Sequence, residues 1–184
     1  WVTIKEILLG YLSVIDWGPT TRPLTEREWL AGANLAFDRR ALEAGGMFNV
    51  NLGRSGGGEA LMSNEEVDLI SRITAAGGKV YYAATAGIDH YIDAGRLRRS
   101  WFRRRAAWQA ASDFVKDPGG ASACAGEAWR RVLARMARWP ATARNLHGLA
   151  AATDDPELFL EQVDAIYDLT LVTLAGFAGA GDDG

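Results

Sequence analysis

The segment from Ser63 to Gly78 constrains the fold most strongly, because both ends of one helix can be read from it. Ser63 is followed by Glu66 at the spacing of a capping box, in which the two side chains satisfy free backbone N–H groups at a helix start. Gly77-Gly78 then closes the segment. Between these ends, apolar residues recur at helical spacing: Val67, Leu69, Ile70 and Ile73. The pattern predicts a helix over residues 64–76.

A strand-like segment follows this helix directly. Lys79 to Ala83 is rich in valine and tyrosine, and residues 87–92 are predicted to form a second short extended piece that ends near His90. A helix, a glycine turn and a strand in this order are typical of α/β layer architectures. We therefore expect an α/β fold.

Helices are also predicted on both sides of this unit. Before it, we expect a helix within residues 2–12, a loop over 16–23, a short helix that ends at Gly45-Gly46 and a flexible glycine-rich loop over 54–59. After it, the predicted helices cover residues 96–115, 123–139 and the chain beyond Pro156, with a break at 117–120. The uncharged part of the last helix, residues 169–181, is shorter than the roughly 20 residues that span a bilayer. No transmembrane helix is therefore expected.

Composition places the chain among ordinary globular domains. It has 184 residues, of which 48% are hydrophobic and 23% charged, so it can form a real core. Cys124 is the single cysteine, which excludes a disulfide scaffold and favours a reducing compartment. The chain starts with Trp1 and shows no secretion signal, so we expect a piece of a longer protein. Cys/His clusters and Walker loops are absent, and neither the Gly-x-Ser-x-Gly match at residues 53–57 nor the Gly-x-Gly-x-x-Gly match at residues 179–184 follows a predicted strand. These observations disfavour zinc-finger, serine hydrolase and hydride transfer functions.

The net charge of −3 hides a strong asymmetry. Residues 96–144 contain twelve Arg and Lys against three acidic residues, an excess of +9, so the rest of the chain carries −12. One interpretation is that this stretch faces lipid head groups, a phosphorylated ligand or nucleic acid, with nucleic acid the weakest. The other is a solvated helix face whose arginines pair with acidic neighbours.

Three acidic residues open the predicted middle helix. Glu65, Glu66 and Asp68 lie in its first turn, where the positive end of the helix dipole keeps a carboxylate ionised. One of them could accept a proton from a hydroxyl group. The simpler interpretation is that Ser63 and Glu66 only cap the helix.

His90 and an aromatic, arginine-rich segment are further candidates. His90 is one of two histidines, and a histidine just after a strand is more often structural than a metal or phosphate ligand. Aromatic residues alternate with arginines at helical spacing between Arg98 and Trp108. They fit a buried helix face, a helix on an anionic membrane, or arginines that hold phosphates.

An ordered series of short motifs resembles the C-terminal half of family 2 glycosyltransferases, which have the GT-A fold. The match covers about residues 1–113. Its pieces are Gly32-Ala33-Asn34-Leu35-Ala36-Phe37 with Arg39-Arg40, Gly45-Gly46-Met47-Phe48, Leu52-Gly53-Arg54, residues 61–69, Arg72, Gly77-Gly78, Val80-Tyr81-Tyr82, His90, Arg96, residues 102–105 and Trp108-Gln109. The resemblance implies a partial GT-A-like, Rossmann-like sheet with flanking helices over residues 1–116, followed by a helical extension over 117–184.

The resemblance also assigns roles to residues. Glu65-Glu66 stand where the family has a Glu-Asp motif whose second acid is the catalytic base, which makes Glu66 the expected base, with Glu65 or Asp68 as residues that share the role. His90 matches a histidine near the metal and the diphosphate. The residues expected to bind substrate are Gly32, Ala33, Asn34, Arg104, Arg105, Trp108 and Gln109. Glutamate in place of aspartate, and Ala110 in place of a frequent glycine, depart from the family pattern.

The implied activity is inverting sugar transfer from a nucleoside diphosphate sugar to a hydroxyl of a glycan or a lipid-linked acceptor. The family's Asp-x-Asp metal motif is absent from these residues, so a divalent cation, Mg²⁺ or Mn²⁺, would be bound mainly by a preceding half, and this chain alone is expected to be inactive. We expect a cytoplasmic location at the inner face of the membrane, with peripheral contact with anionic lipid and no nucleic acid. The alternative is a noncatalytic membrane-binding module that uses residues 96–144.

Overall fold

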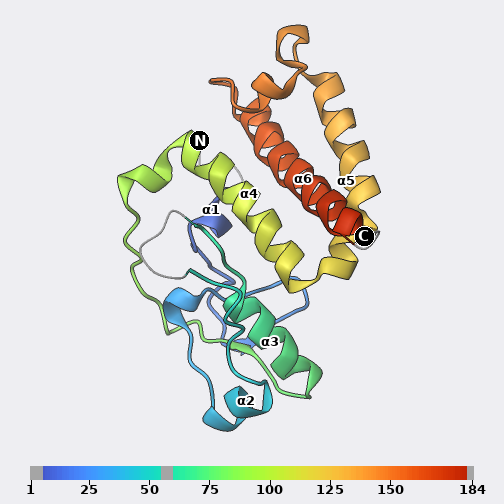
Figure 1. Ribbon diagram of the computed structural model, residues 1–184. Coiled ribbons are helices and arrows are strands. Elements are labelled where there is room, and N and C mark those ends of the chain that lie inside the picture. Colours follow the sequence, from blue (N-terminus) through green and yellow to red (C-terminus); the bar gives the residue numbers. More distant parts are fainter. Residues whose placement is uncertain (1–5, 55–59, 182–184) are drawn as a thin grey trace.

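The computed structural model of the protein describes residues 6–54 and 60–181, and helices make up 59% of it. Three long helices pack together at one end, and shorter elements and loops lie at the other (Figure 1). The α-helices are α1 (Glu6–Tyr11), α2 (Arg39–Ala44), α3 (Glu65–Ala75), α4 (Arg99–Lys116), α5 (Pro118–Arg138) and α6 (Pro156–Gly181). The 3-10 helices are η2 (Gly32–Asn34), η3 (Ala94–Leu97), η4 (Ala141–Ala143) and η5 (Leu146–Leu149).

The described residues contain one small sheet, so the predicted α/β fold with a partial Rossmann-like sheet is wrong. Strands β1 (Arg22–Pro23) and β2 (Tyr81–Tyr82) pair antiparallel, with Arg22 opposite Tyr82. Pro23 has no N–H to donate, which limits the ladder on the β1 side. Of the strand-like run 79–83 only two residues pair, and the expected extended piece over 87–92 contains no strand. The fold is mainly helical.

Helix α3 forms where the apolar stripe predicts it. Leu69 and Ile73 are buried, and they face the loop after α2. A Cβ atom at Gly45 would lie 2.7 Å from the Ile73 side chain, so glycine allows the close approach. Arg72 secures the same contact, because it pairs with Asp68 at 2.8 Å and donates to the backbone oxygen of Met47. The glycine loop predicted at 54–59 lies mostly outside the described residues.

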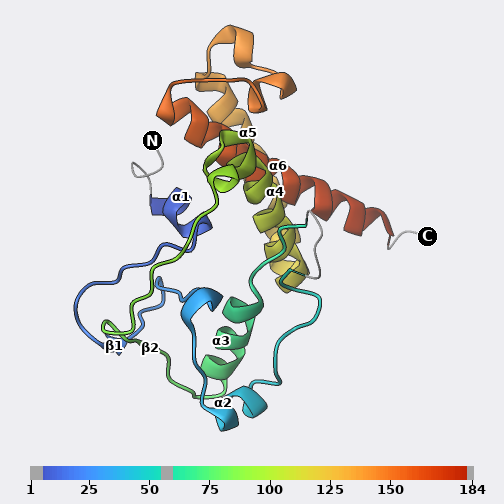
Figure 2. The same ribbon diagram turned by 90° about the vertical axis from the view of Figure 1, so that its left-hand side faces the viewer.

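Helices α4, α5 and α6 form a three-helix unit (Figures 1 and 2). Its core includes Phe102 of α4 and Phe159 of α6, whose rings meet edge to face with centroids 6.5 Å apart. Helix α5 starts at Pro118, so residues 118–120 are helical and only Asp117 separates α4 from α5. The break predicted at 117–120 is therefore shorter than expected, because Asp117 caps α5 by accepting from the backbone N–H of Gly120 at 2.9 Å.

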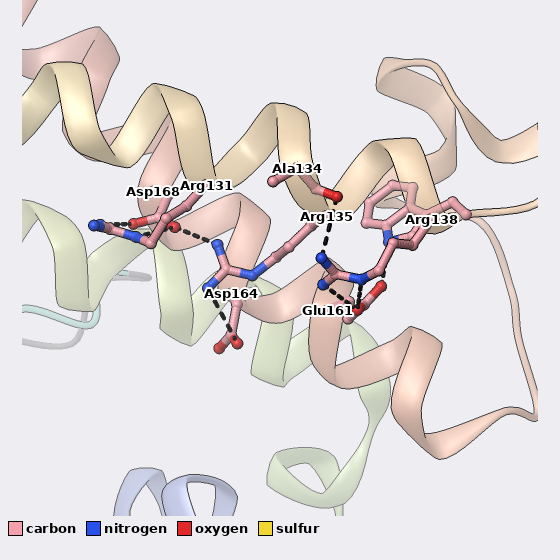
Figure 3. Close-up of polar contacts among 8 residues, drawn as sticks. Arg131, Ala134, Arg135, Arg138, Glu161, Asp164 and Asp168 are labelled. Carbon is pink, nitrogen blue, oxygen red and sulfur yellow. Dashed lines mark hydrogen bonds and ion pairs between the residues drawn. The ribbon is translucent and has the colours of Figure 1, made fainter.

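Three arginines of α5 pair with acidic residues of α6, which runs antiparallel to it (Figure 3). Arg131 and Arg135 both bind the carboxylate of Asp168, and Arg138 binds Glu161 at 2.5 Å. Asp168 is only 2% exposed. The charges of these three arginines are thus offset by acidic residues of α6, which agrees with the interpretation of paired arginines for this part of residues 96–144.

The length and composition of helix α6 disagree with the expectation that no helix of this chain could span a membrane. By length and composition alone, residues 156–180 are long and apolar enough to cross a bilayer, the one such helix among the described residues. The same test is passed by core helices of soluble proteins. The first half of α6 packs against α4 and α5, whereas its end is exposed, with Phe177 at 74%. Figure 2 shows this end projecting beyond the other two helices.

Candidate functional site

A cavity of about 770 Å³ lies where α1, η2, the start of α3 and α4 meet. Six separate segments of the chain contribute to its wall, so no single motif defines it. The predicted site residues that line it are Gly32, Ala33, Glu65, Glu66, His90, Arg105 and Gln109. The acids that open α3 and the imidazole of His90 therefore share one cavity.

The two glutamates are held by backbone that comes close to them. The Oε1 atom of Glu66 accepts a hydrogen bond from the backbone N–H of Gly32 at 3.0 Å. The Glu65 carboxylate lies so close to Gly53, whose φ is +80°, that a Cβ atom there would stand 2.9 Å from it. The Oε2 atom of each glutamate is buried without a hydrogen-bond partner among the described residues.

The capping box predicted for Ser63 and Glu66 does not form. The N-cap of α3 is Asn64, whose φ of 77° lies in the left-handed region and whose side chain makes no cap hydrogen bond. Glu66 bonds to Gly32 instead, and the hydroxyl of Ser63 accepts from Arg105 at 3.0 Å. The simple capping interpretation of Glu66 is therefore wrong.

A polar network fixes Asn64 in this conformation. Its Nδ2 donates to the carboxylate of Asp113 at 2.6 Å, and its Oδ1 accepts from Gln109 at 3.0 Å. Tyr167 of α6 donates to the other oxygen of Asp113 at 2.7 Å. Left-handed backbone at a residue other than glycine costs free energy and persists where the surroundings hold it. Here the surroundings are α4 and α6, and the acid pair comes directly after Asn64 in the chain.

Burial shifts the pKa of Glu65 above its ordinary value. The negative charge of Glu66 raises the pKa further, while the backbone N–H of Glu65 and the charge of Arg54 act in the opposite direction. A carboxylate with a raised pKa is a stronger base than an exposed one.

This shift makes stability depend on pH. A group whose pKa is higher in the folded state than in the unfolded state stabilises the fold at low pH, and this contribution is lost as pH rises through the folded-state pKa. We therefore expect the Glu65→Gln variant, which cannot ionise, to gain free energy of unfolding relative to the wild type between pH 4 and pH 7. Urea unfolding across this range measures the gain, with Glu26→Gln, an exposed glutamate, as control. A difference that does not change with pH would contradict the shift.

Two cationic groups share this cavity with the acids. Arg105 is 8% exposed, stacks over the Tyr11 ring at 5.2 Å and donates to Gln109 at 2.7 Å. Burial lowers the pKa of Arg105 from its ordinary value, because its charge is poorly solvated. Arg96 also lines the cavity, and burial lowers its pKa in the same way. An anion in the cavity would offset this loss of solvation.

Four of the predicted site residues lie elsewhere. Asp68 pairs with Arg72 and holds α3 against the loop after α2. Asn34 lines a neighbouring cavity, where its Nδ2 bonds to the backbone oxygen of Ala86. Arg104 is exposed, and Trp108 packs against the core of the three-helix unit.

Other lining residues carry no sequence signal that identifies them in advance. Tyr11, Trp17 and Trp29 supply aromatic rings, and Asp113 supplies a third carboxylate. Trp17 lies between α1 and β1, and Trp29 lies between β1 and η2. The indole N–H of Trp17 donates to the backbone oxygen of Trp29 at 2.9 Å. Only the helical spacing of four between Gln109 and Asp113 hints that both face the same side.

The described residues do not fit the divalent cation implied by the family resemblance. They bring together no group of three His, Cys, Asp or Glu side chains that could hold a metal ion. His90, the expected metal contact, lines the cavity with its Nδ1 buried and unpartnered in the described part of the chain. No step is therefore assigned to a metal here.

Comparison with known proteins adds no assignment to this geometry. No protein-family model matches the chain, and no curated protein or solved structure matches it either.

Proposed function

We propose that this chain is the acceptor-side part of an inverting glycosyltransferase, which moves a sugar from a nucleoside diphosphate sugar to a hydroxyl group. The mainly helical fold gives no support to this proposal. It is supported by the cavity, where acids, guanidinium groups and aromatic rings surround one space of a size typical for ligands.

One observation supports a ligand in this cavity above all. Buried polar atoms in proteins are nearly always hydrogen-bonded, and those that are not need an explanation. Within the described part of the chain, five buried side-chain atoms that lack a hydrogen-bond partner belong to residues lining this cavity. These atoms are Glu65 Oε2, Glu66 Oε2, His90 Nδ1, Arg96 Nε and Arg105 Nη1. A phosphate and a hydroxyl group together would supply the missing partners for both charge types.

In the proposed reaction, the acids of the cavity take up a proton and its basic groups stabilise the leaving group. Glu66 accepts the proton of the acceptor hydroxyl while the hydroxyl oxygen forms a bond to the anomeric carbon of the donor. The bond from that carbon to the diphosphate oxygen breaks, and the leaving nucleoside diphosphate takes the electron pair. Arg96, Arg105 and His90, which line the same cavity, stabilise this negative charge. Attack from the face opposite the leaving group inverts the anomeric carbon.

Binding of UDP, GDP and dTDP and of their sugars to the longest form of the protein that can be expressed tests the proposal. We expect Arg105→Met to weaken binding of the preferred nucleotide at least tenfold, because a charge-assisted hydrogen bond contributes about 1.5–3 kcal/mol. Arg104→Met is the matched control, since this neighbour is exposed and outside the cavity. Calorimetric titration measures both. Equal affinities of the two variants would contradict the proposal.

We also propose that the protein contacts a membrane, which the exposed apolar end of α6 supports. A location at the cytoplasmic face is what the family resemblance implies. Since Arg131, Arg135 and Arg138 are paired internally, we expect vesicle binding to depend on this end rather than on charge. Phe177→Asp should reduce co-sedimentation with phosphatidylcholine–phosphatidylglycerol vesicles, and 0.5 M salt should change it little. Binding that salt abolishes and Phe177→Asp leaves intact would favour the noncatalytic basic module instead.

A further inference from the structure

A second cavity of about 370 Å³ adjoins the first. It lies between the loop after α1, η2 with the residues that follow it, and the chain from β2 to His90. Ser13, Ala33 and His90 line both cavities, so the two share a wall. A ligand that occupies both cavities would pass these three side chains.

The chemistry of the two cavities differs sharply. The lining of the larger cavity includes arginines and carboxylates, whereas the lining of the smaller one contains no Asp, Glu, Lys or Arg. Aliphatic and aromatic side chains form most of its wall, together with several alanines. The larger apolar members are Val14, Ile15, Leu30, Leu35, Tyr82 and Ile88. A charged phosphate would lose hydration in this cavity without gaining an ionic partner, while an apolar group would be stabilised against its aliphatic side chains.

His90 stands at the boundary between the two environments. Its imidazole lines both cavities, and its Nδ1 atom is buried without a hydrogen-bond partner in the described part of the chain. A ligand that spans both cavities could place an ether or glycosidic oxygen next to this imidazole. Its polar part would then lie in the larger cavity and its apolar part in the smaller one.

We infer that the smaller cavity binds an apolar aglycone, a short alkyl or aryl group attached to the acceptor whose hydroxyl faces Glu66. This inference rests on the proposed function, because it assigns the second part of the same acceptor. It narrows the substrate class from any hydroxyl compound to glycosides that carry an apolar substituent.

A series of alkyl β-D-glucosides from methyl to octyl, kept below their micelle concentrations, tests the inference by calorimetric titration. Each methylene buried in the cavity should tighten binding by up to about fourfold, and the gain should stop once the cavity is full. Ala84→Phe, which places a ring in the cavity, should remove the dependence on chain length. Thr85→Phe is the matched control, because Thr85 is exposed, adjacent and outside the lining.

A second variant tests the inference independently in case Ala84→Phe does not fold. Ala86 lines the same cavity but is exposed, so Ala86→Leu fills part of the space at little risk to the core, and it should shorten the chain length at which the gain stops. Affinity that does not grow with chain length, or grows equally in Ala84→Phe and Thr85→Phe, overturns the inference. If affinity grows with chain length but no nucleotide binds and Arg105→Met has no effect, the smaller cavity binds apolar groups and the proposed sugar transfer is wrong. If nucleotide binds and Arg105→Met weakens it, but affinity does not grow with chain length, only the inference about the smaller cavity is wrong.

Discussion

Replacement of Glu66 by glutamine is expected to lower the rate of sugar transfer by about 100- to 10,000-fold, the usual contribution of a general base. Glutamine keeps the size of the side chain and an oxygen that can accept from the backbone N–H of Gly32, as Oε1 of Glu66 does at 3.0 Å. It lacks only the ability to take a proton. The fold and nucleotide binding should therefore be retained while turnover is lost. Release of nucleoside diphosphate in the presence of acceptor, from the longest form of the protein that can be expressed, measures the effect.

Two comparisons sharpen this result. Glu65→Gln should cause a smaller loss, since Glu65 is assigned a shared role, and Glu43→Gln should cause none, because Glu43 pairs with Arg39 on the exposed surface of α2. Unchanged turnover in Glu66→Gln would remove the base assignment. A larger loss in Glu65→Gln than in Glu66→Gln would transfer the role to Glu65, whose raised pKa suits it to that task.

Asp168→Ala is expected to lower the free energy of unfolding by about 3–5 kcal/mol, the cost of removing one partner from a buried ion pair. The side chain of Asp168 is 3% exposed, and it receives Arg131 Nε at 3.1 Å and Nη2 at 2.5 Å as well as Arg135. Without the carboxylate, the Arg135 guanidinium, which is 19% exposed, keeps only the contact with Asp164 at 3.6 Å. Thermal unfolding should show a decrease in Tm of roughly 6–20 °C for a chain of this size.

Asp154→Ala is the control for this prediction. Asp154 pairs with Arg99 at 3.2 Å, but its side chain is fully exposed, so the same substitution should cost about 0–1 kcal/mol. Equal effects of the two substitutions would mean that the contact between α5 and α6 does not depend on the buried pair.

Local sequence signals predict the helices well, because each helix carries its own boundaries. The apolar stripe of α3 and the Asp-Pro start of α6 are both visible in the sequence, and both helices form where expected. The predicted fold class is wrong for a different reason. Residues 79–83 have strand propensity, but a sheet also needs partners, and the described part of the chain offers only Arg22–Pro23. Propensity within a segment contains no information about whether such a partner exists.

The site shows the same division between local and distant information. Spacing correctly places Glu65 and Glu66 in the first turn of α3, yet the spacing of Ser63 and Glu66 also suggests a capping box, which does not form. The left-handed conformation of Asn64 depends on Asp113 and Gln109, which lie 49 and 45 residues away in the sequence. The resemblance to glycosyltransferases selects several cavity residues, including Arg105 and His90, but it also selects Arg104, which is exposed.

The hydrogen bond from Tyr167 to Asp113 connects the C-terminal helix to the acid pair although Tyr167 does not line the cavity. Asp113 holds Asn64, and Asn64 sets the direction in which the next two residues leave the loop. Shortening the chain before α6, or attaching a bulky fusion partner that displaces it, would thus impair chemistry at a distance. Inactivity of such a truncated protein would then result from loss of the support for Asn64 and not from loss of a reactive group.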